Sequence, residues 1–285
     1  MANFSGFNVI EEDDFATAWR KLIFFALTLG VLKNFGSEKE PKKASFNSMQ
    51  CVILYGHAIN QILRGEFHPQ YSFGGQKGDI YTKEFNRNWF LNEYSLFPET
   101  RKFVYTYIGR LIRHTRPSRT ISEFLKYYLM KQECFVDQLA ILKDQLKEQV
   151  RTGRLSTRSQ AKTWEAFNDL FSEFPPCLQT IQVIYLGNNE VEIVLIWRSR
   201  DLLRAWMVNL YAVVNMINRE VIAPNNCRII KITDVIINPH IYAGDIDEAK
   251  KISLTAKNPQ YMFRAKPESM VFFQGEQCSS FFISK

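Results

Sequence analysis

The sequence predicts an α+β fold in which a large, mainly antiparallel or mixed sheet is flanked by helices, and three observations carry this prediction. Two alternating apolar segments, 179–186 and 190–198, are joined by Gly187-Asn188-Asn189, a turn sequence typical of a β-hairpin. The segment from Asp201 to Ile222 is apolar almost all round, which predicts a buried helix. A further strand pattern follows at Arg228–Ile237.

Composition indicates a folded chain with a full hydrophobic core. The 285 residues are 46% hydrophobic and 14% aromatic, which excludes disorder for the chain as a whole. Because the sequence contains no internal repeat and no convincing linker, the simplest prediction is one domain over residues 1–285. The formal net charge of +7 suits a ligand that carries phosphate, with nucleic acid as the alternative. The basic residues are spread along the chain, which makes nucleic acid the less favoured partner.

Cysteine usage points to a reducing compartment. The five cysteines form no CxxC pair and their number is odd, so neither a metal site nor a disulfide framework is expected. Residues 1–14 do not resemble a signal peptide, and the apolar run Leu22–Leu32 is too short to cross a bilayer. We therefore expect a cytoplasmic protein with no membrane partner.

The N-terminal part begins with a predicted helix. Asp13 or Asp14 is suited to cap it, an apolar stripe runs to about Leu29, and Gly30 is suited to end it. The polar stretch 34–44 predicts a loop.

A strand and a short helix are expected next. Phe46–Tyr55 has a strand pattern, and Ala58–Leu63 predicts a helix that ends at Gly65. Residues 66–88 show no clear period, and residues 101–112 mix β-forming residues with two tyrosines at alternate positions.

The middle of the chain leads toward a cysteine. Ile121–Val150 predicts a helix, and a break near Gln132–Phe135 is left open. Thr157–Trp164 predicts a strand that precedes Cys177.

The strongest signal for chemistry lies around Cys177. It follows Pro175-Pro176, which hold the backbone extended. Arg198 and Ser199 end the neighbouring strand of the hairpin, so the thiol and the guanidinium could lie close together. A guanidinium beside a thiol favours the nucleophilic thiolate. Arginine and serine together also suit a phosphate dianion, since they supply a fork of donors and a hydroxyl.

Three further polar residues gain meaning only in combination. Asn209 lies within the predicted buried helix, where an amide is costly unless it is hydrogen-bonded. His240 and Tyr242 are two apart on an extended segment, so their side chains point to the same side. Taken alone, a core hydrogen bond explains Asn209, and a polar strand end explains the other two.

The order of these residues resembles the thymidylate synthase superfamily, which includes the pyrimidine nucleotide hydroxymethylases. The matching motifs are Pro-Pro-Cys at Cys177, Arg-Ser-x-Asp at Arg198–Asp201, an asparagine eight residues later at Asn209, and His-x-Tyr at His240 and Tyr242. The resemblance is best over residues 137–250 and thinner over 15–110. It implies a thymidylate synthase-like fold and a homodimer formed through the sheet.

The resemblance implies a role for each matching residue. Cys177 corresponds to the nucleophile and Tyr107 to the active-site tyrosine. Asp201 corresponds to a residue that contacts folate. Arg158 resembles an arginine that is donated across a dimer to the phosphate bound by the other subunit. The remaining nucleotide-binding residues are Arg198, Ser199, Asn209, His240 and Tyr242.

The chain departs from the family pattern at four places. Leu178 stands where a histidine commonly follows the nucleophile, and Asn238-Pro239 replaces a usual Asp-small pair. The catalytic glutamate of the family would fall near His57 or Ala58, neither of which is a carboxylate. The C-terminal segment that closes over folate is not recognisable in residues 279–285.

The resemblance implies a folate-dependent C5 methyl- or hydroxymethyltransferase that acts on a pyrimidine nucleoside monophosphate through a covalent cysteine adduct. Its implied cofactor is 5,10-methylenetetrahydrofolate. We expect dUMP rather than dCMP, because the Asn209 carboxamide can donate to O4 and accept from N3–H of uracil. The alternatives are a catalytically silent nucleotide-binding homologue and, less favoured, a nucleic-acid binder.

Overall fold

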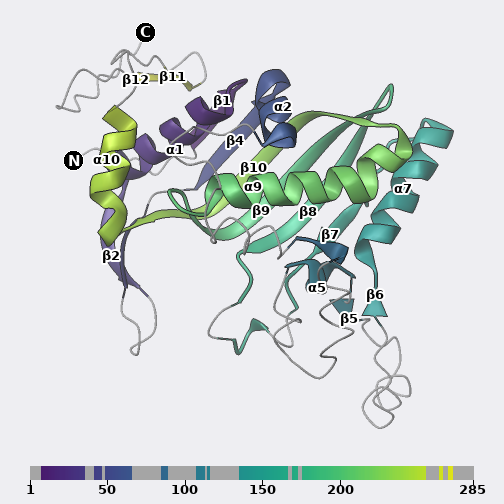
Figure 1. Ribbon diagram of the computed structural model, residues 1–285, viewed down its shortest axis with the longest axis horizontal. Coiled ribbons are helices and arrows are strands. Elements are labelled where there is room, and N and C mark those ends of the chain that lie inside the picture. The colour runs from purple at the N-terminus through teal and green to yellow at the C-terminus, as the bar shows by residue number, and fades with distance from the viewer. Residues whose placement is uncertain are drawn as a thin grey trace.

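The computed structural model shows a mixed sheet with helices packed against it (Figure 1). The fold is α+β, as the sequence predicts. The structure describes residues 8–35, 42–46, 49–65, 85–88, 107–112, 114–115, 135–165, 169–172, 175–254, 263–265 and 269–271.

The main path of the sheet runs through six strands in the order β1-β4-β10-β9-β8-β7. β10 is parallel to β9 and antiparallel to β4, whereas β8 is antiparallel to both β9 and β7. β1 is parallel to β4. The bounds of these strands are β1 Asn8–Glu12, β4 Gln50–Tyr55, β7 Gln160–Lys162, β8 Leu178–Gly187, β9 Glu190–Asp201 and β10 Arg228–Tyr242.

The β8–β9 hairpin is encoded by its turn. Asn188 and Asn189 have φ values of 51° and 58°, the left-handed values that a two-residue hairpin turn requires and that asparagine tolerates. The alternating apolar residues then fix the register, which brings Leu178 opposite Trp197. The predicted hairpin is confirmed.

The helix α9 (Trp206–Ile217) connects β9 to its parallel neighbour β10, as a parallel pair requires. Every residue of α9 except Tyr211 and Asn215 is buried, and Figure 1 shows the helix lying across β8, β9 and β10. The helix is shorter at both ends than predicted, because Asp201 ends β9, residues 202–205 form turns, and α9 passes into a π-helical turn at Asn218–Ile222.

The first helix begins and ends where the sequence predicts, and the second ends as predicted but begins two residues before the expected Ala58. α1 (Phe15–Leu29) begins where the Asp14 side chain accepts a hydrogen bond from the Thr17 amide at 2.7 Å. α2 (Gly56–Arg64) ends at Gly65, whose φ of 69° suits glycine. The other α-helices within the described chain are α5 Tyr107–Ile112, α7 Gln138–Thr152 and α10 Ile246–Leu254. None of the helices in these parts of the chain is long and apolar enough to cross a membrane.

The polar stretch 34–44 was expected to be a loop, but both of its described ends, residues 34–35 and 42–44, belong to strands, while residues 36–41 lie outside the described residues. β2 (Val31–Phe35) pairs with β3 (Lys42–Phe46), and β3 pairs with the end of β10 at His240–Tyr242. This pairing joins segments that are far apart in the sequence, so the polar composition of β3 gives no local signal of it. The expected strand Phe46–Tyr55 is accordingly divided between the end of β3 and β4.

Two other elements differ in length from the expectation. The strand expected over 157–164 is confined to β7. Of the helix expected over 121–150, the described part is α7, which begins where Asp137 accepts from the Ala140 amide at 3.0 Å, and the short strand at Phe135–Val136 precedes it, next to the break that was left open. Residues 116–134 and 66–84 lie outside the described residues. The remaining short strands are β5 His114–Thr115, β6 Phe135–Val136, β11 Phe263–Ala265 and β12 Ser269–Val271.

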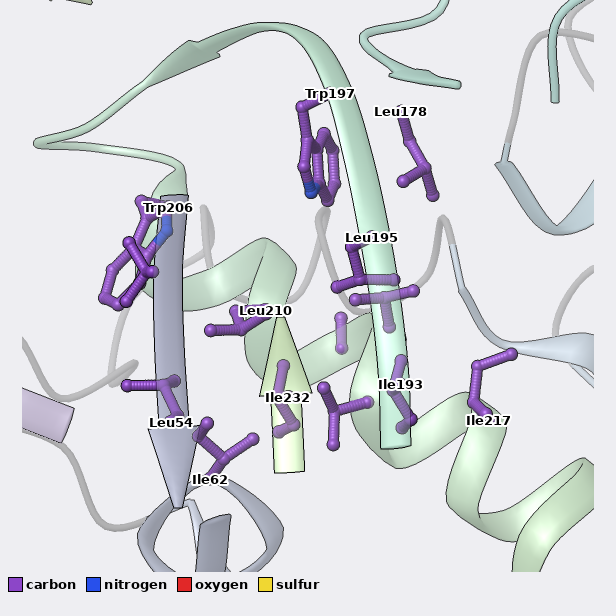
Figure 2. Packing of buried hydrophobic residues seen from close by; sticks show 14 of the residues in the cluster. Leu54, Ile62, Leu178, Ile193, Leu195, Trp197, Trp206, Leu210, Ile217 and Ile232 are labelled. Carbon is purple, nitrogen blue, oxygen red and sulfur yellow. The ribbon is translucent and has the colours of Figure 1, made fainter. Parts of the chain in front are cut away.

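The core lies between one face of the sheet and the helices. Figure 2 shows Leu54, Ile193 and Ile232, from three neighbouring strands, together with Leu210 of α9. All four are fully buried. Burying each such aliphatic side chain contributes about 1.5–3 kcal/mol to the stability of the fold, so these residues determine which face of the sheet packs against the helices.

The opposite face of the sheet, here called the open face, is only partly covered by the described chain. Apolar side chains are half-exposed at its centre, at Ile184, Val194, Ile196 and Val235. At its margins the exposed apolar residues are Val9, Tyr55, Leu186 and Ile237. Strand alternation places all of them on the side away from the core.

Candidate functional site

The end of β9 presents two predicted phosphate-binding residues side by side. The first part of the strand buries every second residue up to Trp197, but the next buried residue is Arg200. Arg198 and Ser199 therefore stand between them as two consecutive, partly exposed residues. The parallel strand β10, which lies next to β9, loses its alternation of buried and exposed residues at the same level, because Ile237 and Asn238 are both exposed.

Cys177 immediately precedes β8 and lies directly beside Arg198. The Arg198 amide donates to the Cys177 carbonyl oxygen at 2.7 Å, which ties the two strand ends together. The Arg198 Nη2 atom lies 4.0 Å from the Cys177 Sγ atom and donates to the Pro175 carbonyl oxygen at 3.1 Å. The cysteine is half-buried, and a guanidinium at this distance favours its thiolate.

Tyr107, the first residue of α5, reaches the backbone of the candidate nucleophile. Its hydroxyl oxygen accepts hydrogen bonds from the amides of Cys177 and Leu178, at 3.3 and 3.4 Å. Its ring stacks on Phe85 with centroids 4.9 Å apart and meets Trp197 edge-on at 6.0 Å. These two amides and the two rings fix the phenol oxygen beside the backbone of Cys177.

Ser199, His240 and Tyr242 form a second part of the same cluster. The Ser199 hydroxyl lies 3.4 Å from His240 Nδ1, and Nδ1 lies 3.3 Å from the Asn238 carbonyl oxygen. Burial lowers the pKa of His240, so its imidazole is neutral at neutral pH. The His240 and Tyr242 rings meet edge-on with centroids 5.1 Å apart.

Asp201 organises the turn between β9 and α9. Its Oδ1 atom accepts from the amides of Leu203 and Arg204, at 3.0 and 3.1 Å. Burial raises the pKa of the Asp201 carboxyl to about 6, against the opposing effect of these two amides. Arg204 pairs in turn with Asp245 at 2.7 Å and with Glu248, both of which follow the end of β10.

Asn209 lies in the first turn of α9 with its carboxamide buried. The residue is 7% exposed, and its Oδ1 atom has no hydrogen-bond partner among the described residues. It lies one turn after Trp206, whose carbonyl oxygen accepts from Arg200 at 3.0 Å, so this end of α9 packs against the end of β9. An unsatisfied buried acceptor costs about 1–3 kcal/mol, which a ligand donor would relieve.

Arg158 is not part of this cluster. Its side chain is exposed, and within the described parts of the chain no hydrogen bond or ion pair joins it to Cys177 or Arg198. The carbonyl oxygen of Thr157 accepts from Gln182 Nε2 at 2.9 Å. Because Gln182 belongs to the open face, the segment that carries Arg158 lies at the edge of that face.

The helix α2 offers no carboxylate where the family pattern calls for a glutamate. Ala58 is fully buried and lies on the apolar side of the helix with Ile59 and Ile62, while His57 is exposed. Glu66 lies outside the described residues.

An ion pair beneath the site was missed by the sequence reasoning. Arg200 Nη1 donates to both carboxylate oxygens of Asp234, at 2.8 and 2.7 Å, and both side chains are almost completely buried. The Trp206 indole donates to Asp234 Oδ2 at 2.8 Å. A charged residue inside the apolar run of β10 was the available signal, although the sequence does not reveal its partner.

A scan against models of protein families gives no match, and no curated protein matches the chain significantly. Within the described residues, no three His, Cys, Asp or Glu side chains gather in a way that could hold a metal ion.

Proposed function

We propose that the chain binds a pyrimidine nucleoside monophosphate and transfers a one-carbon unit to its C5 atom, with Cys177 as covalent nucleophile. One observation carries the proposal: Arg198 Nη2 lies 4.0 Å from Cys177 Sγ, so a group suited to phosphate adjoins a thiol suited to attack. The motif order that resembles the thymidylate synthase superfamily supports the same assignment.

In this proposal the Cys177 thiol forms the covalent bond to the nucleotide. The Cys177 thiolate adds to C6 of the pyrimidine, and the electron pair of the C5–C6 double bond moves toward C5 and the C4 oxygen. C5 thereby becomes nucleophilic. Tyr107, whose hydroxyl is held by two backbone amides, helps to move the C5 proton. Loss of the thiolate at the end of the reaction restores the double bond.

The polar residues of the cluster bind and orient the nucleotide. Arg198 and Ser199 hold the 5′-phosphate through a guanidinium fork and a hydroxyl. His240 and Tyr242 bind the sugar hydroxyl, and the neutral imidazole can offer either a donor or an acceptor. Asn209 pairs with the base through its buried carboxamide.

In this proposal 5,10-methylenetetrahydrofolate supplies the one-carbon unit when it is bound. Asp201 is suited to hold it, since both backbone hydrogen bonds that shape the turn use Oδ1 and neither requires the second carboxylate oxygen. A half-buried carboxylate of this kind is a suitable acceptor for the donors of a pterin ring.

We further propose that two chains pair through the open face and that each supplies Arg158 to the other's phosphate site. The face carries apolar side chains that are partly exposed at its centre, including Ile184, Val194 and Ile196. A two-fold axis would cover this face with its own copy. Arg158 lies at the edge of the face, exposed and apart from the cluster of its own chain.

Release of tritium from C5 of labelled dUMP, in the presence of methylenetetrahydrofolate, tests this function. We expect release by the wild type and none by Cys177→Ser, whose affinity for dUMP stays within roughly tenfold because the phosphate-binding residues remain. Absence of release from every pyrimidine monophosphate would contradict one-carbon transfer, and turnover by Cys177→Ser would contradict the covalent mechanism.

One observation favours a second candidate, a nucleotide-binding protein without catalytic activity. Ala58 presents a buried methyl group where the family pattern calls for a glutamate. This candidate predicts that calorimetry detects dUMP binding by the wild type while no pyrimidine nucleotide loses its C5 tritium.

A further inference from the structure

The pair Arg200–Asp234 connects three of the elements that carry the site. Arg200 follows Ser199 on β9, Asp234 belongs to β10, and the Trp206 indole and carbonyl bind the pair from the start of α9. The side chains of Arg200 and Asp234 are 1% and 0% exposed. Such a pair costs several kcal/mol in desolvation, so its presence is weak evidence for stability and calls for another explanation.

The guanidinium of Arg200 is linked by aromatic contacts to the candidate nucleophile. Its Cζ atom lies 3.8 Å from the centroid of the Trp197 ring. Trp197 meets the Tyr107 ring edge-on at 6.0 Å, and the Tyr107 hydroxyl accepts from the Cys177 amide at 3.3 Å. A continuous line of contacts therefore runs from the buried cation to Cys177.

The two charges of the Arg200–Asp234 pair act on different groups. Burial lowers the pKa of the Arg200 guanidinium, and the groups that oppose this effect are Asp234, Tyr107 and Cys177. The Asp234 carboxylate acts instead on Cys51 of β4, whose pKa is raised to about 11 by burial and then by this charge. Of the two charges, the Arg200 guanidinium is the one that the Trp197 and Tyr107 rings connect to Cys177.

We propose that Arg200 and Asp234 are positioning residues for the nucleophile: they hold the ends of β9 and β10 together, and the cationic end of the pair favours the Cys177 thiolate. This inference rests on the proposed role of Cys177. Other charged or titratable groups near the thiol, among the described residues, are Arg198 on β9, Tyr107 on α5 and His240 on β10, next to Arg198.

The rate of Cys177 alkylation by iodoacetamide, followed by peptide mass spectrometry between pH 6 and 10, tests the proposal. The assay requires neither nucleotide nor folate, so its outcome is independent of whether one-carbon transfer occurs. Arg200→Met is expected to slow alkylation at pH 7 by about fivefold to tenfold, because a facing cation is lost. Asp234→Asn is expected to speed it by a similar factor, because the cation is no longer neutralised.

The opposite signs are the decisive feature, because a purely structural pair would change the rate in the same direction in both variants or not at all. Arg228→Met is the matched control, since Arg228 pairs with Glu190 across the far, exposed ends of the same two strands. Shifts of equal sign, or shifts no larger than that of the control, would overturn the proposal.

If a single variant does not fold, the double variant Arg200→Met with Asp234→Leu replaces it. This variant leaves no buried charge unpaired, and such replacements are often neutral for stability or stabilising. Its alkylation should be slower than that of the wild type at pH 7. An unchanged rate in the folded double variant would overturn the proposal.

Discussion

Asn209 is the residue that we expect to read the base. Its carboxamide is buried, and its Oδ1 atom is unsatisfied among the described residues. Uracil offers an N3–H donor to this oxygen and an O4 acceptor to the amide nitrogen, whereas cytosine presents the reverse pattern. The amide can flip and partly satisfy cytosine, so the discrimination from this one residue is modest.

We predict tighter binding of dUMP than of dCMP, with Asn209→Asp shifting the preference toward dCMP. A carboxylate accepts from the cytosine amino group but cannot donate to O4, and each mismatched buried contact costs about 1–3 kcal/mol. Calorimetric titration of both proteins with both nucleotides measures the change. A wild-type preference for dCMP would show that another residue reads the base.

Asp201 makes stability depend on pH in an unusual direction. Burial raises its pKa to about 6, so the folded chain holds this proton more tightly than the unfolded chain does. Its contribution to stability is therefore present below about pH 4 and is lost as the pH rises through about 6.

Asp201→Asn should remove this dependence while keeping the turn, since an asparagine oxygen also accepts from backbone amides. Relative to the variant, the wild type should lose up to about 2 kcal/mol of unfolding free energy between pH 4 and pH 7. Urea denaturation across this range measures the difference, with Asp247→Asn as the control because Asp247 is 91% exposed. Parallel pH profiles for wild type and Asp201→Asn would refute the shift.

At the scale of elements, the sequence predicts well what is encoded locally. The turn at Asn188 and Asn189, the cap at Asp14 and the glycine stop at Gly65 each act within a few residues, and each is found where expected. The hairpin and the break in alternation at the end of β9 then bring Arg198 beside Cys177.

Features that depend on distant partners could not be predicted in this way. The polar residues of β3 form a strand between β2 and the end of β10, and the β10 partner is far away in the sequence. The six residues of α5 are helical despite their β-forming composition, because tertiary packing buries Ile108 and Leu111. The pairing of Arg200 with Asp234 likewise exists only once β9 and β10 are neighbours.

The turn after β9 and the segment after β10 are joined by Arg204, which contacts Asp245 and Glu248. The Arg204 side chain is 41% exposed, so we expect Arg204→Ala to cost only about 0.5–1 kcal/mol of stability. Because this link holds the ends that carry Ser199 and His240, dUMP affinity should fall by a factor of about two to five.

The matched control is Arg228→Ala, which breaks an exposed ion pair at the opposite ends of β9 and β10. It should lose similar stability and retain full dUMP affinity. Equal affinity losses in the two variants, measured by calorimetry, would refute the idea that the Arg204 link acts on the site.

At the scale of the whole molecule, the proposed dimer builds each phosphate site from two chains. Arg158→Ala should weaken dUMP binding by about 1.5–3 kcal/mol, the cost of one charge-assisted contact. Mixing Arg158→Ala with Cys177→Ser should restore activity to roughly a quarter of the wild-type rate, since half of the dimers are mixed and one site in each is intact. No recovery after confirmed subunit exchange would place the site within one chain.

The central claim, that Cys177 and Arg198 belong to one nucleotide site, is tested most directly by protection of Cys177 from iodoacetamide. Saturating dUMP should slow its alkylation at least about tenfold, whereas deoxyuridine at the same concentration should protect weakly, because it lacks the phosphate that we propose Arg198 binds. Arg198→Ala should lose the protection by dUMP. Unchanged alkylation of Cys177 in the presence of dUMP, or equal protection in Arg198→Ala, would contradict the account.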